Sequence, residues 1–197
     1  MRILFVTSNQ GKVSETRKLL ADSGHTVEQL LVRGVAPEFD EPKELGIEAV
    51  ANSKMVQALI LLEQEGIEGV AVMVEDSGVF LDAFDEWPGA KSAEVEREIG
   101  LEGILSMLRE GMPRGAEYRA VAKVSDGVST WSAEGVCRGK IADSIRGSGG
   151  FGYDPIFIPN EGDGHTFGEW EEGKYSGITH RAKAMNSLAE LLRSPSR

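Results

Sequence analysis

Residues 1–20 read MRILFVTSNQGKVSETRKLL, and this stretch decides the fold. Ile3–Val6 is a short apolar, partly β-branched run that predicts a buried strand. Small polar residues follow at Thr7–Lys12, and Val13–Ala21 predicts a helix. A strand, a polar loop and a helix direct free backbone N–H groups and the positive end of the helix toward an anion. The stretch therefore indicates either a phosphate-binding loop, to which Lys12 adds a positive charge, or an ordinary first β–α connection.

Composition limits the classes of protein that this chain can belong to. With 197 residues, it is one compact domain, 1–197, or two tightly joined lobes, and it is long enough to bury a sizeable core. The net charge of −11 argues against binding to duplex nucleic acid or to a membrane surface, but it allows a small phosphorylated ligand. The lone cysteine, Cys137, permits no internal disulfide and fits a reducing, cytoplasmic location. No apolar run approaches membrane-spanning length.

The order of the predicted elements indicates a mixed sheet. Alternating strands and helices in the first half give way to a hairpin around Ser125-Asp126-Gly127 in the second half. Such a change predicts an α/β fold with an elongated second lobe, and a cleft between lobes is a favoured place for a ligand. The pattern predicts strands at Thr26–Arg33, Val70–Val74, Glu117–Val124, Ser129–Arg138 and Ile156–Ile158, and helices at Leu45–Glu65, Leu101–Glu110 and His180–Leu192.

Carboxylates gather at two places in the chain. Glu75-Asp76-Ser77-Gly78 ends the apolar run Val70–Val74 abruptly, and residues 38–44 form an acidic, proline-containing loop. Two carboxylates at the end of a buried strand are costly unless they meet a metal or a cation, and ligands of open α/β sheets gather at the ends of strands. The stretch therefore predicts either a site of this kind or a plain Asp-Ser-Gly turn.

The glycine-rich stretch Gly147–Pro155 is the most unusual part of the sequence. It carries Phe151 and Tyr153, whose rings either stack on a nucleobase or cap the core above a glycine-rich turn. His180 and Arg181 stand at the start of the last predicted helix. An arginine gains nothing from the dipole at that end of a helix, so it indicates either an anion or carbonyl of a ligand, or a solvated side chain.

Together these stretches resemble the inosine triphosphate pyrophosphatase family. They occur in the order of that family and are spread over almost the whole chain. The Gly-Phe-Gly-Tyr-Asp-Pro run is the most specific of them. The matching segments are Thr7–Lys12 with Glu15, Glu75–Gly78, Trp87–Gly89, Gly150–Phe157 and Thr179–Ala184.

The resemblance implies an enzyme that cleaves the bond between the α- and β-phosphates of deaminated purine nucleoside triphosphates. Its substrates would be ITP, dITP and XTP, its products a nucleoside monophosphate and pyrophosphate, and its role the cleansing of the nucleotide pool. The resemblance also implies Mg²⁺ as cofactor, an elongated mixed sheet flanked by helices, a nucleotide-binding cleft between two lobes, and a cytoplasmic homodimer without nucleic-acid or membrane partners.

The resemblance assigns roles to individual residues as well. Asp76 is expected to be the general base and a metal ligand, with Glu38 as the second metal carboxylate and Glu75 as its local competitor. Cationic donors such as Lys174 and Arg181 would favour the 6-keto group of the base, which adenine lacks. The expected substrate-binding residues are Thr7, Ser8, Asn9, Gln10, Gly11, Lys12, Lys54, Ser77, Phe151, Gly152, Tyr153, Asp154, Lys174, His180 and Arg181.

The chain departs from the family pattern in two places, and two other functions compete with the main hypothesis. Ala90–Glu94 stands where many relatives have Tyr-Ser-Ala-Arg, which leaves Lys91 as the alternative phosphate contact, and Gly177 lengthens the spacing between Lys174 and His180. The competing functions are a Maf-type pyrophosphatase, which prefers pyrimidine or modified nucleotides, and a module that binds purine triphosphates without cleaving them.

Overall fold

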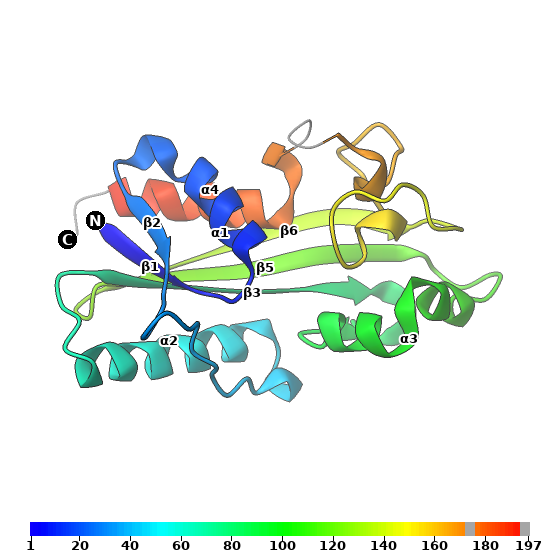
Figure 1. Cartoon of the computed structure of the whole chain (residues 1–197). Coiled ribbons are helices and arrows are strands. Elements are labelled where there is room, and N and C mark those ends of the chain that lie inside the picture. Colours follow the sequence, from blue (N-terminus) through cyan, green and yellow to red (C-terminus); the bar gives the residue numbers. More distant parts are fainter. Residues whose placement is uncertain (172–175, 194–197) are drawn as a thin grey trace. The chain divides into compact units, whose positions relative to one another are not determined.

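A mixed α/β fold is seen in the computed structural model, which describes residues 1–171 and 176–193 (Figure 1). Within these residues one sheet runs in the order β2-β1-β3-β5-β6-β7, and β4 pairs with β3. The strands are β1 (Arg2–Val6), β2 (Thr26–Gln29), β3 (Ala71–Leu81), β4 (Pro88–Gly89), β5 (Gly115–Ser125), β6 (Thr130–Ile141) and β7 (Phe157–Pro159). The helices are α1 (Gln10–Leu19), α2 (Ile47–Gln64), α3 (Ser92–Met107) and α4 (His180–Arg193).

The chain divides into two compact units, and β3, β5 and β6 each contribute to both. The first unit contains Met1–Asp76, Ala120–Gly135 and the chain from Ala182 onward, and the second contains Ser77–Arg119 and Val136–Arg181. Each unit has its own hydrophobic core. No helix among the described residues has the length and apolar content needed to cross a bilayer.

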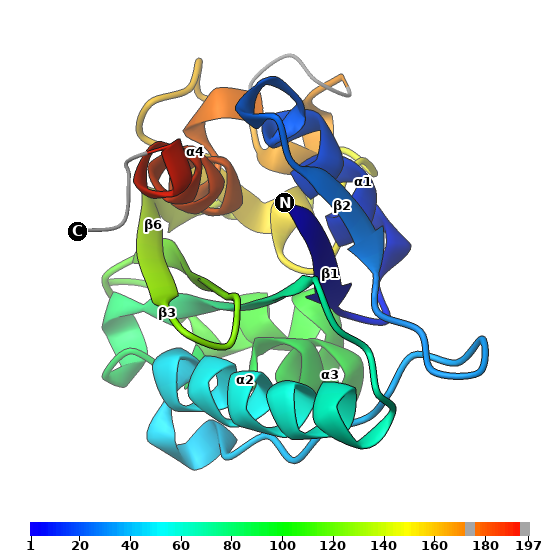
Figure 2. The same cartoon turned by 90° about the vertical axis from the view of Figure 1, so that its left-hand side faces the viewer.

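The first unit is layered around the parallel strands β1, β2 and β3. Helices α1 and α4 cover one face of these strands, and α2 covers the other (Figure 2). Because alternate residues of a strand point to opposite faces, Ile3 and Phe5 of β1 pack toward α1 and α4. The core on that face consists mainly of Ile3, Phe5, Val13, Leu20, Val27, Met73, Met185 and Leu188.

The second unit encloses a core that is rich in aromatic side chains. It is formed where the ends of β3 and β6 and the start of β5 pack with α3 and the residues around β7. The thiol of Cys137 is buried there. The largest contributors are Leu81, Ile104, Tyr118, Ile141, Tyr153, Ile156, Phe157 and Phe167.

The expected loop at Thr7–Lys12 is shorter in the structure, because α1 begins at Gln10 rather than at Val13. Asn9 has an extended backbone, and its side-chain oxygen accepts a hydrogen bond from the backbone N–H of Lys12 at 3.2 Å. This cap satisfies a donor that the first turn of a helix leaves unpaired. Gln10, Gly11 and Lys12 therefore belong to the first turn of α1.

The expectation that the third strand ends at Val74 is wrong, since β3 runs on through Glu75–Gly78 to Leu81. β1 pairs with β3 only as far as Val74, but β4 then pairs with Val79 and Phe80. Glycine at position 78 permits this second pairing, because a Cβ atom there would lie 2.1 Å from the carbonyl oxygen of Gly89. The two acidic residues consequently lie within a strand, just beyond the level at which β1 ends.

Two other predicted boundaries differ. β2 ends at Gln29 instead of continuing to Arg33, because its pairing with β1 stops there, and the chain then turns at Arg33 and Gly34, which both have positive φ. α3 begins at Ser92 rather than at Leu101, although non-helical geometry at Gly100 interrupts it. The long helix α2, the hairpin of β5 and β6 and the helix beginning at His180 are confirmed.

Candidate functional site

An exposed helix N-terminus follows β1 in the first unit. Thr7 fixes this connection, because its hydroxyl oxygen accepts a hydrogen bond from the backbone N–H of Asn9 at 3.1 Å and its carbonyl oxygen accepts one from Gln29 Nε2 at 2.7 Å. Ser8, Asn9 and Gln10 are exposed. The start of α1 therefore presents backbone N–H groups and the positive end of a helix dipole, as an anion requires.

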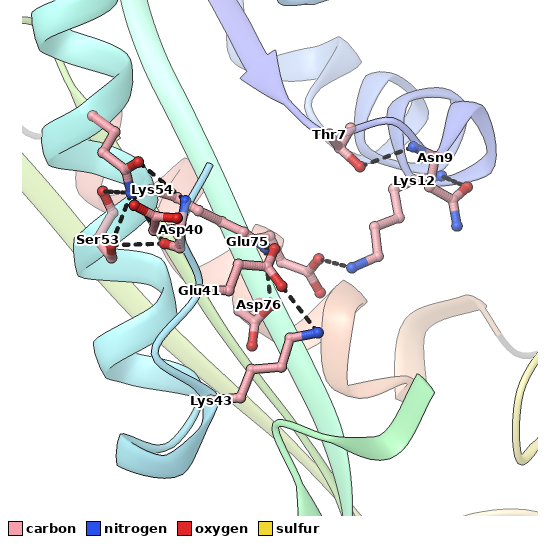
Figure 3. Close-up of polar contacts among 11 residues, drawn as sticks. Thr7, Asn9, Lys12, Asp40, Glu41, Lys43, Ser53, Lys54, Glu75 and Asp76 are labelled. Atoms are coloured by element: carbon pink, nitrogen blue, oxygen red, sulfur yellow. Dashed lines mark hydrogen bonds and ion pairs between the residues drawn. The ribbon is translucent and has the colours of Figure 1, made fainter. Parts of the chain in front are cut away.

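Glu75 and Asp76 are directed to opposite faces of β3, as neighbouring residues of a strand are (Figure 3). Glu75 meets α1, where its Oε2 atom lies 2.6 Å from Lys12 Nζ and its side chain is fully buried. Asp76 meets α2, where its Oδ1 atom lies 3.1 Å from Lys54 Nζ. Each carboxylate thus has its own lysine, and the side chain of Asp76 keeps 13% of its surface exposed.

Lys54 also joins Asp76 to a third carboxylate that the sequence analysis did not assign. Its Nζ atom lies 2.6 Å from Glu41 Oε1, and the other oxygen of Glu41 lies 3.1 Å from Lys43 Nζ. Two carboxylates and two ammonium groups therefore alternate along Asp76, Lys54, Glu41 and Lys43 (Figure 3). Part-burial of such a chain is tolerated because every charge has a partner.

Hydrogen bonds hold the loop that carries Glu41 against α2. The carbonyl oxygen of Asp40 accepts hydrogen bonds from Ser53 Oγ at 2.8 Å and from Gln57 Nε2 at 3.0 Å. The backbone N–H of Asp40 donates to Gln57 Oε1 at 3.1 Å. Glu38, by contrast, is exposed and makes no hydrogen bond or ion pair with the part of the chain that the structure describes.

Asp76 has the protonation behaviour of a general base that works near neutral pH. Burial raises the pKa of Asp76 to about 6, while the nearby Lys54 and Lys12 ammonium groups act to lower it and the Glu75 carboxylate acts to raise it. A carboxylate that is partly exposed, has a raised pKa and faces fixed cations is a candidate functional group on physical grounds.

The residues expected to bind the base are in the second unit. Phe151 is 52% exposed, and the Arg181 guanidinium carbon lies 5.5 Å from the centre of its ring. Arg181 and His180 are buried, at 3% and 6% exposure. The Tyr153 ring is also buried, and its hydroxyl donates to the carbonyl oxygen of Ser92 at 3.1 Å. Phe151 is therefore the ring of this stretch that a planar ligand can reach, whereas the Tyr153 ring belongs to the core.

Asp154 closes the glycine-rich loop on itself. Its Oδ2 atom accepts a hydrogen bond from the backbone N–H of Phe151 at 2.9 Å, and its Oδ1 atom accepts one from the Tyr118 hydroxyl at 3.0 Å. The Tyr118 ring also stacks on His180, with centroids 4.5 Å apart and planes 5° apart. Tyr118 is thus a second residue that the sequence analysis did not assign, since an aromatic residue in a strand indicates core packing.

The structure gathers the predicted residues into two groups. Thr7–Lys12, Lys54 and Asp76 lie in the first unit, and Ser77, Phe151–Asp154, His180 and Arg181 in the second. Lys174 lies outside the described residues. The cleft between lobes, the role of Lys91 and the metal-binding role of Glu38 stay predictions. The acidic composition of residues 38–44 was the signal that could have identified Glu41.

The chain is similar to known proteins along almost its whole length. Residues 3–191 match the model of the Ham1 family. The chain is 38% identical over 201 residues to the dITP/XTP pyrophosphatase of Thermococcus kodakarensis, covering 98% of each chain, and 39% identical over 191 residues to that of Methanopyrus kandleri, covering 96% of this chain and 95% of the relative.

Solved structures give the same assignment. The Staphylococcus aureus Ham1 protein has a TM-score of 0.81 at 27% identity, covering 98% of both chains. The nucleoside-triphosphatase / dITP/XTP pyrophosphatase from Mycobacterium abscessus has a TM-score of 0.67 at 28% identity, covering 95% of this chain and 98% of its own. These findings confirm the resemblance drawn from the sequence motifs. The chain therefore belongs to the Ham1 family.

Proposed function

We propose that this protein hydrolyses ITP, dITP and XTP to the nucleoside monophosphate and pyrophosphate, with Mg²⁺ as cofactor. The observation that carries the proposal is Asp76, a carboxylate whose pKa is raised to about 6 and which lies just beyond the end of β1. Asp76 can accept a proton, and the exposed N-terminus of α1, which follows β1, suits phosphates. The names of the archaeal relatives, dITP/XTP pyrophosphatase, supply the substrate class.

The residues of the first unit have different roles in the proposed reaction. The N-terminal turn of α1 and the Lys12 ammonium group bind and orient the phosphates. Asp76 accepts a proton from the water that attacks the α-phosphorus, and the bridging oxygen leaves with pyrophosphate. Lys54 balances the charge beside Asp76. Positioning and electrostatic stabilisation account for most of the rate enhancement in phosphoryl transfer.

The carboxylates beside Lys54 fit a magnesium ion in number and type. Mg²⁺ prefers hard oxygen ligands and is often bound by one or two carboxylates together with waters and substrate phosphates. A single ammonium group contacts both Asp76 and Glu41, which supports their sharing one cation. Within residues 1–171 and 176–193, no group of three or more His, Cys, Asp and Glu residues could hold a metal by itself. The ion would neutralise charge on the phosphate oxygens.

Glu41 and Glu38 can be separated as candidates for the second metal ligand. We expect Glu41→Gln to raise the Mg²⁺ concentration for half-maximal activity at least tenfold, and Glu38→Gln to change it less than twofold. Calorimetric titration of each variant with Mn²⁺ alone gives a readout that does not depend on turnover. A larger effect of Glu38→Gln in both measurements would return the role to Glu38.

The pKa of Asp76 predicts an acidic limb in the pH–rate profile. Because a general base must be unprotonated, kcat/KM at low Mg²⁺ is expected to fall about tenfold for each pH unit below about 6. A bound cation favours the charged carboxylate, so saturating Mg²⁺ is expected to move this limb to lower pH. A profile that is level from pH 5 to 7 at low Mg²⁺ would exclude Asp76 as the base.

Recognition of the 6-keto group is proposed to use the cationic donors of the second unit. The guanidinium group of Arg181 lies over the ring of Phe151, so a base bound at this ring would lie near a cationic hydrogen-bond donor. Adenine presents an amino donor at the same position, which cannot accept a hydrogen bond from the Arg181 guanidinium group, and this mismatch costs affinity.

The function is tested by measuring pyrophosphate release from ITP, dITP, XTP, ATP, GTP, UTP and dTTP with Mg²⁺. We expect rapid release from the three deaminated nucleotides and much slower release from ATP and GTP. Cleavage of UTP or dTTP without cleavage of ITP would indicate the Maf-type function, and tight ITP binding without product a binding module. A homodimer and a cytoplasmic location are part of the proposal, and sedimentation and cell fractionation test them.

A further inference from the structure

Tyr118 contacts two separate stretches of the proposed base-binding group. It lies on β5 within the second unit, and only 7% of its surface is exposed. One face of its ring stacks on His180, at the start of α4, and the ring of Phe157 packs edge-on at 4.7 Å. Its hydroxyl donates to Asp154 at 3.0 Å.

Asp154 connects Tyr118 to the glycine-rich loop. It accepts the backbone N–H of Phe151, and a Cβ atom added at Gly150 would lie 2.1 Å from its Oδ2 atom, so the loop backbone is packed closely against the carboxylate. Burial and the charge of Asp154 raise the pKa of Tyr118 well above its usual value, so the hydroxyl stays a donor. A donor to a carboxylate forms a stronger hydrogen bond than a neutral pair does.

We propose that Tyr118 is a positioning residue for base recognition, which holds Phe151 through Asp154 and holds the start of α4 through His180. The proposal rests on the function proposed above. A purely structural role predicts that the ring alone matters, because a phenylalanine ring fills the same core space and stacks on His180 equally well. A positioning role predicts that the hydroxyl matters for nucleotide binding.

Tyr118→Phe removes the hydroxyl and keeps the ring. We expect this variant to raise KM for dITP about tenfold, in the range for a lost hydrogen bond to a charged group, with kcat changed less than twofold. Thr166→Val is the matched control. It removes another buried hydroxyl of the second unit, which donates to the carbonyl oxygen of Arg146 at 2.7 Å. We expect it to lower the melting temperature without raising KM.

A double-mutant cycle tests whether Tyr118 acts through Asp154. In an Asp154→Ala background, Tyr118→Phe is expected to change KM less than twofold further. Asp154→Asn, which keeps the size of the side chain, replaces Asp154→Ala if the alanine variant does not fold. An undiminished effect of Tyr118→Phe in this background would contradict action through Asp154.

Hydrogen exchange of the nucleotide-free protein gives a test that does not depend on the proposed function. The Phe151 amide is expected to exchange at least tenfold faster in Tyr118→Phe than in the wild type, with amides of β7 unchanged. If wild-type protein releases no pyrophosphate from any nucleotide, the proposed function fails, but the exchange result still tests the positioning. Unchanged exchange together with unchanged KM would overturn the role of Tyr118.

Discussion

Asp76→Asn is expected to lower pyrophosphate release from dITP by about 10³-fold and, at pH 8, to raise the melting temperature. The loss of rate has two sources, since the variant removes a general base and a negatively charged metal ligand. The gain in stability has a different source, because Asn carries no charge and the ionised carboxylate of Asp76 is unfavourable in its largely buried position.

The sign of the stability effect follows from the pKa. The pKa of Asp76 is about 6 in the folded protein and 3.8 for an ordinary aspartate, so the folded state binds the proton more tightly. The resulting stabilisation is fully present below pH 3.8 and is lost as the pH rises through about 6. At pH 8 the ionised group is expected to lower the free energy of unfolding by about 3 kcal/mol relative to a neutral side chain.

The measurement compares the melting temperatures of wild type and Asp76→Asn from pH 4 to 8 without metal. The two should agree near pH 4 and diverge as the pH rises, to a difference of about 6–12 °C for a chain of this length. Asp40→Asn is the matched control, because it removes the charge of an exposed aspartate in the same unit. We expect it to change neither activity nor melting temperature appreciably. A less stable Asp76→Asn protein, or one that keeps a tenth of the activity, would contradict the assignment.

Local sequence patterns predicted the elements that depend mainly on residues close together in the chain. The spacing of apolar residues gave α2 and α4, and the turn at Ser125-Asp126-Gly127 gave the hairpin of β5 and β6. The pattern failed at Glu75–Gly78, where small polar residues indicate a turn and the structure has a strand. That strand depends on pairing with β4, and its acidic residues depend on lysines 63 and 22 positions away in the chain. Tertiary contacts therefore overrode local preference there.

The candidate site was predictable where a motif defines it and unpredictable where packing does. The motifs indicated Asp76 and the start of α1, and the family resemblance indicated Lys54. They did not give Glu41, because a loop has no periodicity that fixes which of its carboxylates meets Lys54. They did not separate Phe151 from Tyr153 either, because only packing decides which of two rings in a glycine-rich stretch enters the core.

Lys12→Met is expected to destabilise the protein by about 3 kcal/mol, because it removes the ammonium group that balances the buried charge of Glu75. Breaking a buried ion pair costs about 3–5 kcal/mol. We expect a cost at the lower end of this range, because 18% of the Lys12 side chain is exposed. The melting temperature should fall by about 6–12 °C. Lys18→Met on the exposed side of α1 is the matched control and should lower it by less than about 2 °C.

The double variant Lys12→Met/Glu75→Gln separates the two roles proposed for Lys12, as the partner of Glu75 and as a phosphate ligand. Replacing both charges also removes the buried negative charge that Lys12 balances, so the double variant should recover most of the lost stability. Its activity should nevertheless stay low, with KM for dITP raised about tenfold, if Lys12 also binds phosphate. Recovery of activity together with stability would show that the ammonium group serves Glu75 alone and that the helix N-terminus holds the phosphates without it. Failure to recover stability would show that Lys12 or Glu75 stabilises the protein through contacts other than this ion pair.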